Sequence, residues 1–265
     1  ARLDAQANVR ALSGNIVFPG FTAPKLLWVA ENEPEIFAQT AKVLLPKDYV
    51  GFWLTGSHVS DMSDSAGTAW LDVGQRGWSQ PLLEASGMRA DQMPDLVEGS
   101  EIAGTLRADL ATELGLPDGV SIVGGAGDNA AAACGAGALK EGDGFVSLGT
   151  SGVLLAAKDS FSPSPASAVH TFCHAIPDTW YQMGVILSAT DSLNWLSRNL
   201  GVGAAELTSK LGAQIAEPGG IQFLPYLSGE RTPHNDSAIR GAFLGLDISA
   251  GHNELTQSVL EGVSF

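Results

Sequence analysis

The hydrophobic periodicity of the chain changes at Pro117, and this change limits the folds that the chain can adopt. From Thr22 to about Leu116, apolar residues recur mostly at helical spacing. After Pro117, short apolar runs alternate with glycine-containing turns, which is typical of strands. A chain that mixes helices and strands on this scale is expected to form an α/β or α+β architecture.

Three helices are predicted before Pro117. The run TAPKLLWVAENEP predicts a helix that ends before Pro34, and PEIFAQTAKVLL predicts another that begins at Pro34, since proline suits the first helical turn. The run GTLRADLATELGLP, residues 104–117, predicts a third helix with a glycine stop. The segments 57–72 and 78–88 are polar, and we assign them no element.

The second half of the chain predicts strands and hairpins. VSIVGGAGD indicates a buried strand that enters a glycine turn, and the alanine-rich run after it indicates a tightly packed helix. GFVSLGTSGVLLAAKD predicts two strands around Gly149–Gly152, and HTFCHAIPDTWYQMGVIL predicts two more around Pro177–Asp178. The chain lacks a first methionine and ends on an apolar helical face without a stop signal, so we expect it to be part of a longer protein.

The charge balance excludes several classes of partner. The chain has 14 Lys and Arg against 29 Asp and Glu, a formal charge of −15. Binding to nucleic acid or to a membrane surface needs basic patches, so neither is expected. Two cysteines, Cys134 and Cys173, are too few for a disulfide scaffold and indicate reduced thiols. No signal peptide or membrane span is evident, and we expect a cytoplasmic protein.

The first candidate site is GGAGDNAA, residues 124–131. Gly125-x-Gly127-x-x-Ala130 resembles a dinucleotide-binding fingerprint, but Asp128 would lie inside the turn and repel a pyrophosphate. Two interpretations of the acid–amide pair stay open. Asp128 or Asn129 is the N-cap of the following helix, or Asp128 is a general base beside a hydroxyl-bearing substrate.

The second candidate site is SLGTSG, residues 147–152. Its backbone N–H groups and the hydroxyls of Thr150 and Ser151 suit an anion-binding turn, although a plain hairpin turn uses the same residue types. The chain has no G-x-x-x-x-G-K-[ST] loop and none of the protein-kinase motifs. Any phosphate site must therefore be built from turns.

Two further groups are weaker candidates. His170, Cys173 and His174 suggest a zinc site, but strand alternation would separate Cys173 from the histidines, so packed or hydrogen-bonded histidines are favoured. The segment FLPYLSGERTPHND, residues 223–236, places Glu230 beside Arg231. This pair is either an ordinary surface pair or part of a ligand-facing loop.

Several of these motifs together resemble the FGGY carbohydrate kinases. Two family signatures are present nearly letter for letter, GFTAPKLLWVAEN at residues 20–32 and GAFLGLDISAGHNELTQSVLE at residues 241–261. The segments GGAGDNAA, SLGTSGV, VHTFCHA and FLPYLSGERTPHND lie between them in the order that the family shows. The resemblance covers essentially the whole chain.

The resemblance implies an α/β fold of two actin-like, ribonuclease H-like ATPase domains that flank a cleft, both incomplete here. Residues 1–137 would be the C-terminal part of the N-terminal domain, and residues 138–265 the N-terminal part of the C-terminal domain. The first phosphate loop and the adenine site would lie outside the chain, so we expect the 265 residues alone to be inactive.

The resemblance also implies a reaction and its residues. Asp128 matches the catalytic base and sugar contact, Asn129 a second sugar contact, Gly149 and Thr150 the second phosphate loop, and Gly229 a glycine near the nucleotide phosphates. The implied reaction uses ATP and Mg²⁺ to convert D-xylulose to D-xylulose 5-phosphate. A family kinase acting on glycerol, ribulose or gluconate is one alternative, and an NAD-binding oxidoreductase is another. The expected partner is a small-molecule sugar, and a homodimer is left open.

Overall fold

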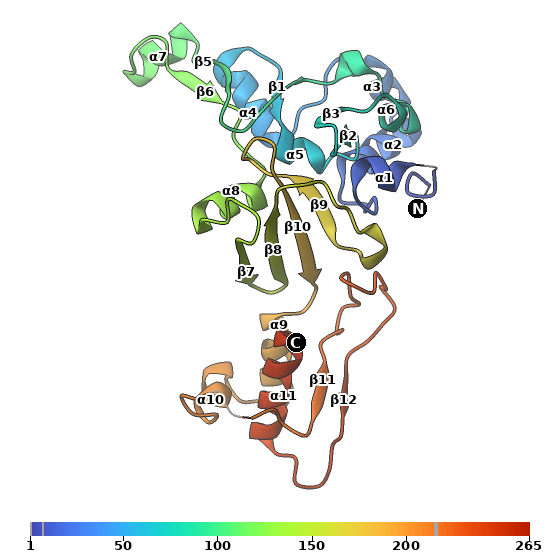
Figure 1. The fold of residues 1–265 in the computed structure, drawn as a ribbon, viewed down its shortest axis with the longest axis vertical. Helices are drawn as coiled ribbons and strands as arrows, with labels where there is room; N and C mark the ends of the chain where they lie inside the picture. The colour runs from blue at the N-terminus through green and yellow to red at the C-terminus, as the bar shows by residue number, and fades with distance from the viewer. Residues whose placement is uncertain (1, 7, 215–216) are drawn as a thin grey trace. The chain divides into compact units, whose positions relative to one another are not determined.

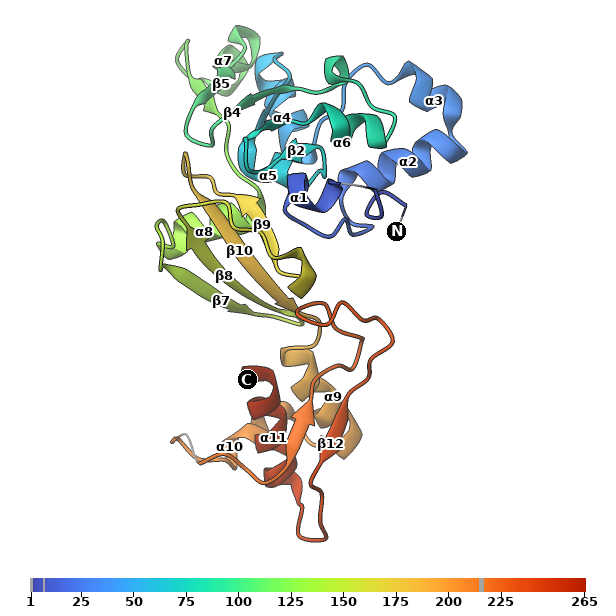
Figure 2. The same cartoon turned by 45° about the vertical axis from the view of Figure 1, so that its right-hand side comes forward.

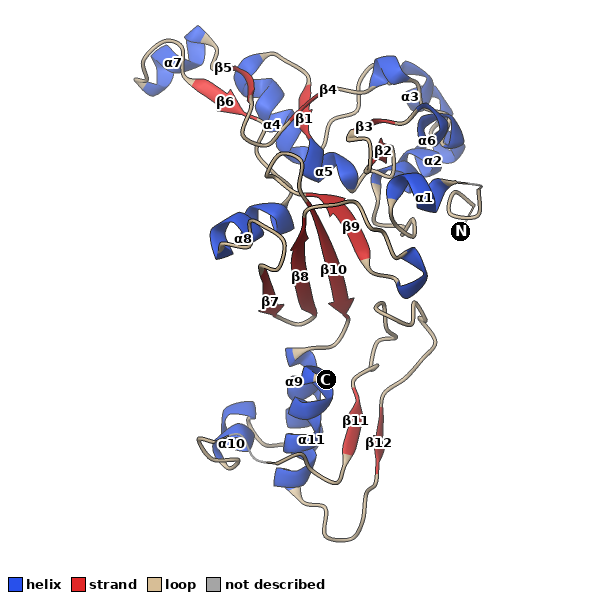
Figure 3. Cartoon of the chain, in the orientation of Figure 1, coloured by secondary structure: helices blue, strands red, loops and turns tan. Residues whose placement is uncertain are grey.

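The computed structural model describes residues 2–6, 8–214 and 217–265 and shows a mixed α/β chain (Figures 1 and 3). It divides into two compact units. The first unit is Ala1–Phe145 with Leu155–Met183, and the second is Val146–Leu154 with Gly184–Phe265. The domain boundary between residues 137 and 138 stays a prediction. None of the helices formed by the described residues combines the length and the apolar character that crossing a bilayer requires.

The predicted N-terminal helices are present, but two are shorter than expected. The helix predicted over residues 104–117 is limited to α7 (Ala108–Leu114), because Gly104 and Thr105 belong to the strand β5 (Ile102–Thr105). The helix α2 (Thr22–Asn32) ends before Pro34, as predicted, and α3 (Pro34–Gln39) begins there. Contrary to the prediction, α3 does not continue to residue 45. Gln92 accepts a hydrogen bond from Val43 N at 2.9 Å and donates its side-chain amide to Thr40 O at 2.8 Å, so this segment bonds to a distant part of the chain.

The segment 57–72, which had no predicted element, holds short strands and a helix that position the site. The strand β1 (Val59–Asp61) pairs in parallel with β4 (Asp95–Val97), and α5 (Met62–Ala66) follows β1 directly. The remaining elements of the first unit up to residue 120 are α1 (Val9–Ser13), α4 (Pro46–Thr55), β2 (Leu71–Asp72), β3 (Gly77–Trp78), α6 (Gln80–Ala85), a 3₁₀ turn (Ala90–Gln92), β5 (Ile102–Thr105) and the predicted helix α7 (Ala108–Leu114).

The strand predicted before the glycine turn is present but is not buried. It is β6 (Ser121–Val123), which pairs antiparallel with β5 in a two-stranded sheet and leaves Val123 52 % exposed. The following helix, α8 (Asp128–Ala136), buries Ala130 and Ala133 completely. Tight packing is therefore confined to one face of α8, because its other residues are exposed or half-buried.

Both predicted hairpins form. The strands β7 (Gly144–Leu148) and β8 (Gly152–Lys158) flank the first turn, and β9 (His170–Cys173) and β10 (Trp180–Ile186) flank the second. The four belong to one sheet in the order β7-β8-β10-β9 (Figure 2), and β10 and β9 pair antiparallel from Trp180↔Cys173 to Met183↔His170. A 3₁₀ turn (Pro165–Ser167) lies between β8 and β9.

The second unit is built around a small apolar core. Its elements are α9 (Thr190–Leu200), α10 (Ala204–Ser209), β11 (Gln222–Leu224), β12 (Ala242–Leu244) and the predicted C-terminal helix α11 (His252–Ser264). The buried core residues are Leu196, Leu207, Phe223 and Val259. A Cβ atom at Gly262 would lie 2.2 Å from Phe223 O, so glycine lets α11 pack directly on the backbone of β11.

Candidate active site

Asp128 is presented by the turn that joins β6 to α8, residues 124–127. It is the first residue of α8 and is exposed, and its Oδ1 accepts hydrogen bonds from Asn129 N at 2.7 Å and Asn129 Nδ2 at 3.0 Å. The N-cap position belongs to Gly127. The interpretation of Asp128 or Asn129 as the N-cap residue is therefore wrong, and the carboxylate at the positive end of the helix is free to meet a ligand.

The turn is held at both ends by side chains from α4 and α5. At its first residue, Gly124 O accepts a hydrogen bond from Lys47 Nζ at 3.0 Å. At its last residue, Gly127 N donates to Ser63 Oγ at 3.0 Å. Asp61 connects the two side chains, because its Oδ1 lies 2.9 Å from Lys47 Nζ and its Oδ2 accepts from the Ser63 hydroxyl.

Asp64 lies against the same turn. A Cβ atom at Gly127 would lie 3.4 Å from Asp64 Oδ1, so the half-buried carboxyl packs on the backbone just before Asp128. Burial raises the pKa of Asp64 to about 6. The negative charge of Asp61 raises this pKa further and Lys47 opposes the shift, while Asp128 makes a smaller contribution.

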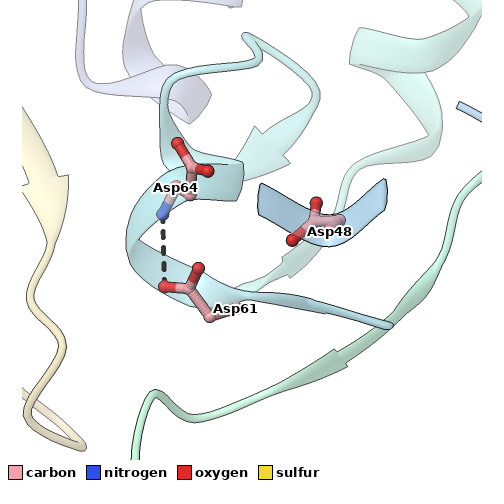
Figure 4. Close-up of side chains that lie close together, drawn as sticks. All are labelled: Asp48, Asp61 and Asp64. Atoms are coloured by element: carbon pink, nitrogen blue, oxygen red, sulfur yellow. Dashed lines mark hydrogen bonds between the residues drawn. The ribbon is translucent and has the colours of Figure 1, made fainter. Parts of the chain in front are cut away.

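Asp48, Asp61 and Asp64 form the one group of potential metal ligands found among residues 2–6, 8–214 and 217–265 (Figure 4). Their ligand atoms lie within 4.8 Å of one another. However, Lys47 Nζ lies 2.6 Å from Asp48 Oδ1 and 2.9 Å from Asp61 Oδ1, and both aspartates are fully buried. Burial lowers the pKa of Lys47, but these two carboxylates raise it more, so its ammonium group is the cation of the cluster.

The dinucleotide-binding alternative has no structural support. That fingerprint belongs to a parallel β-α-β unit in which the glycine turn follows a strand of a parallel sheet. Here the strand before the turn, β6, pairs antiparallel with β5. The exposed carboxylate of Asp128 also stands where the pyrophosphate would bind.

In the second unit, the turn between β7 and β8 is fixed to the start of α9. Gly149 O accepts hydrogen bonds from Thr190 N at 3.0 Å and Thr190 Oγ1 at 2.7 Å, and Thr150 O accepts from Ala189 N at 2.8 Å. These contacts direct the turn's carbonyl groups toward α9. The side chains of Thr150 and Ser151 are exposed, so their hydroxyls are accessible to a ligand.

Gly229 is buried and has a steric reason to be glycine. Its φ is +80°, and a Cβ atom there would lie 2.9 Å from Ser237 Cα. The neighbouring Glu230 is only 3 % exposed, and its Oε1 accepts from Leu187 N at 3.0 Å and Arg231 N at 2.7 Å. The surface-pair interpretation of Glu230 is therefore wrong, because its carboxylate braces the strand end that leads to α9.

The histidines are packed and hydrogen-bonded, as predicted. His170 Nδ1 lies 3.0 Å from Asn15 Oδ1, and His174 Nε2 lies 3.0 Å from Ala138 O. Both cysteines are free, and burial raises the pKa of Cys173 to about 12, which keeps this thiol protonated. This segment contributes to the core of the first unit.

The candidate residues therefore fall into two groups. Asp128 and Asn129 lie together in the first unit, whereas Gly149, Thr150 and Gly229 belong to the second. The residues around the turn before Asp128 were not predicted from the sequence, namely Lys47, Asp61, Ser63 and Asp64. The signal that could have found two of them is Asp61 followed by Ser63, an N-cap carboxylate at the start of a helix within a segment that had no predicted element.

Comparison with known proteins matches the two halves of the chain to one family. Residues 2–135 match the N-terminal domain of the FGGY family of carbohydrate kinases, and residues 144–265 match its C-terminal domain. The chain is 51% identical to the xylulose kinase of Escherichia coli (strain K12) and 48% identical to that of Klebsiella pneumoniae, in each case over 97% of this chain and 53% of the relative. It thus spans about half the length of these curated relatives.

Solved structures agree with this match. The crystal structure of a xyloylose kinase from Brucella ovis has 61% identity and a TM-score of 0.97, and the match covers 99% of this chain and 54% of that kinase. The xylulose kinase of Rhodospirillum rubrum has 27% identity and a TM-score of 0.89, covering 98% and 53%. These matches confirm the predicted α/β, actin-like fold class. The chain belongs to the FGGY family of carbohydrate kinases.

Proposed function

We propose that this chain belongs to a kinase that converts D-xylulose to D-xylulose 5-phosphate with ATP. In this proposal the chain provides the general base that acts on the sugar hydroxyl and part of the phosphate-binding site. The observation that carries the proposal is the 51% identity, over 97% of this chain, to a protein named xylulose kinase. Asp128, exposed at the first residue of α8, supplies the chemical group that such a reaction needs.

Asp128 acts as the general base. Its carboxylate accepts the proton of the sugar 5-hydroxyl while that oxygen forms a bond to the γ-phosphorus and the bond to the leaving ADP oxygen breaks. Asn129 donates its side-chain amide to Asp128 Oδ1 at 3.0 Å, which orients the base. In this proposal Asn129 also contacts a neighbouring sugar hydroxyl.

Gly149, Thr150 and Gly229 hold the nucleotide phosphates in this proposal. The turn at Gly149 and Thr150 fits a polyphosphate, because its carbonyl groups bond to the start of α9 and its hydroxyls stay exposed.

When bound, Mg²⁺ neutralises charge on the β- and γ-phosphates. Lys47 already pairs with Asp48 and Asp61, two of the three aspartates of the buried cluster, and its ammonium group occupies the place of a cation there, so the cluster does not fit Mg²⁺. A homodimer and a cytoplasmic location stay predictions.

A substrate panel tests the proposal. A kinase of the relatives' length that contains this chain is assayed for ADP release with D-xylulose, D-ribulose, gluconate and glycerol, each with MgATP. We expect kcat/KM for D-xylulose to exceed that for every other acceptor by at least about 100-fold, since a site built to pair a substrate's hydroxyls discriminates strongly. A higher kcat/KM for another acceptor would refute the substrate but leave the kinase assignment intact.

A further inference from the structure

Asp128 follows a turn whose two ends are bound by side chains from other elements. The Gly124 carbonyl and the Gly127 amide are the two ends of this turn, and each bonds to a side chain from another element. The two side chains come from Lys47 in α4 and Ser63 in α5. The turn also donates backbone hydrogen bonds from Gly124 N to Glu101 O and from Gly125 N to Gly99 O, both at 2.9 Å, so the bond from Gly127 N to Ser63 Oγ is the one that holds the end next to Asp128.

Asp61 makes these contacts one network. One of its carboxylate oxygens lies 2.9 Å from Lys47 Nζ, and the other accepts both the hydroxyl and the backbone amide of Ser63, the latter at 2.8 Å. Asp61 is fully buried, and burying a carboxylate is costly unless it is paired with a cation and hydrogen-bonded. Both of its oxygens are used to fix groups that in turn bind the Asp128 turn.

The Ser63 hydroxyl both donates and accepts a hydrogen bond in this network. It donates to Asp61 Oδ2 and accepts from Gly127 N at 3.0 Å, which uses its one proton and one lone pair. Gly127 is the N-cap of α8, so its amide fixes the backbone immediately before Asp128. Loss of the hydroxyl would free that amide and leave one oxygen of Asp61 short of a donor.

We propose that Lys47, Asp61 and Ser63 form a clamp that positions Asp128 for proton abstraction from the substrate. The clamp residues act through the Gly124–Gly127 turn, so they are positioning residues in this proposal. This inference rests on the proposed role of Asp128 as the base. It predicts that loosening the clamp lowers turnover more than substrate binding, because a displacement of about 1 Å in a reacting group can cost about 100-fold in rate.

The test is a set of Ser63 variants in the full-length kinase, assayed with D-xylulose and MgATP. Ser63→Ala is expected to lower kcat about 10- to 100-fold with less than about a threefold change in KM for D-xylulose. Ser63→Thr, which keeps the hydroxyl, is expected to recover most of the turnover. The control is Ser65→Ala: Ser65 is buried in the same helix but bonds to Ser60 Oγ instead of the turn, and its loss should leave kcat unchanged.

Two further measurements separate the possible failures. In the Asp128→Asn background, Ser63→Ala should lower turnover no further, because positioning matters only when the base is present. Amide hydrogen exchange in Ser63→Ala should accelerate at residues 124–128 and not across the first unit. Unchanged kcat in Ser63→Ala, or exchange that accelerates across the whole unit, overturns the clamp alone. Full turnover in Asp128→Asn overturns the base assignment and the clamp with it.

Discussion

Replacement of Asp64 by asparagine should raise the free energy of unfolding of the chain at neutral pH and leave it unchanged in acid. Burial raises the pKa of this carboxyl from 3.8 to about 6, so the folded state binds its proton more tightly than the unfolded state does. The stability associated with that proton is fully present below pH 4 and is lost as the pH rises to about 6. Asparagine has nearly the same shape and cannot ionise.

The magnitude follows from the two pKa values. The difference between 3.8 and about 6 corresponds to about 3 kcal/mol at about 1.4 kcal/mol for each pKa unit. Because the side chain is only half-buried, screening by solvent reduces the effect, and we expect about 2 kcal/mol. Asp64→Asn should therefore raise the free energy of unfolding by this amount at pH 8 and by close to zero at pH 4.

The assay is urea unfolding of the 265-residue chain at pH 4, 5, 6, 7 and 8, followed by tryptophan fluorescence in a Trp195→Phe background. Trp195 lies in the second unit and the other tryptophans in the first, so the signal reports the unit that contains Asp64. Asp118→Asn, at an exposed position, is the control for loss of one charge. A gain that is absent at pH 8, or equally large at pH 4, would refute the electrostatic explanation.

Two other predictions concern backbone packing at Gly144 and the turn at Gly149 and Thr150, which is proposed to bind the nucleotide phosphates. A Cβ atom at Gly144 would lie 2.4 Å from Leu155 O, so Gly144→Ala should lower the free energy of unfolding by about 1–3 kcal/mol in urea denaturation. The control is Gly135→Ala on α8, where a Cβ atom meets open space. This substitution should leave the free energy of unfolding unchanged or raise it by about 0.5–1 kcal/mol. Thr150→Val in the full-length kinase should raise KM for MgATP about tenfold by removing an exposed donor, and an effect confined to D-xylulose would contradict this.

Local patterns predicted the elements that depend on nearby residues. The hairpins around Gly149–Gly152 and Pro177–Asp178 and the helix that stops before Pro34 all formed, because turn and cap residues act within a few positions. The prediction that the helix continues beyond Gln39 was wrong, because a distant residue, Gln92, hydrogen-bonds to the backbone of this segment. Long-range pairing of this kind leaves no periodicity in the sequence.

The candidate site was predictable in part. The glycine turn and the acid–amide pair placed Asp128 correctly at the head of a helix, although the N-cap itself is Gly127. The contacts that hold the turn were not predictable, because Lys47 and Ser63 precede Gly124 and Gly127 by 77 and 64 positions. The shifted pKa of Asp64 was likewise hidden, since it results from burial and from charges that only the fold brings together.

We propose above that Asp128 is the base of a D-xylulose kinase. The most direct measurement compares wild type with Asp128→Asn in a full-length kinase that contains this chain, by single-turnover phosphate transfer from MgATP and by equilibrium binding of D-xylulose. We predict a loss of at least about 1,000-fold in the transfer rate, within the range that general-base catalysis supplies, with D-xylulose binding still measurable. Transfer by Asp128→Asn at the wild-type rate would show that Asp128 is not the base.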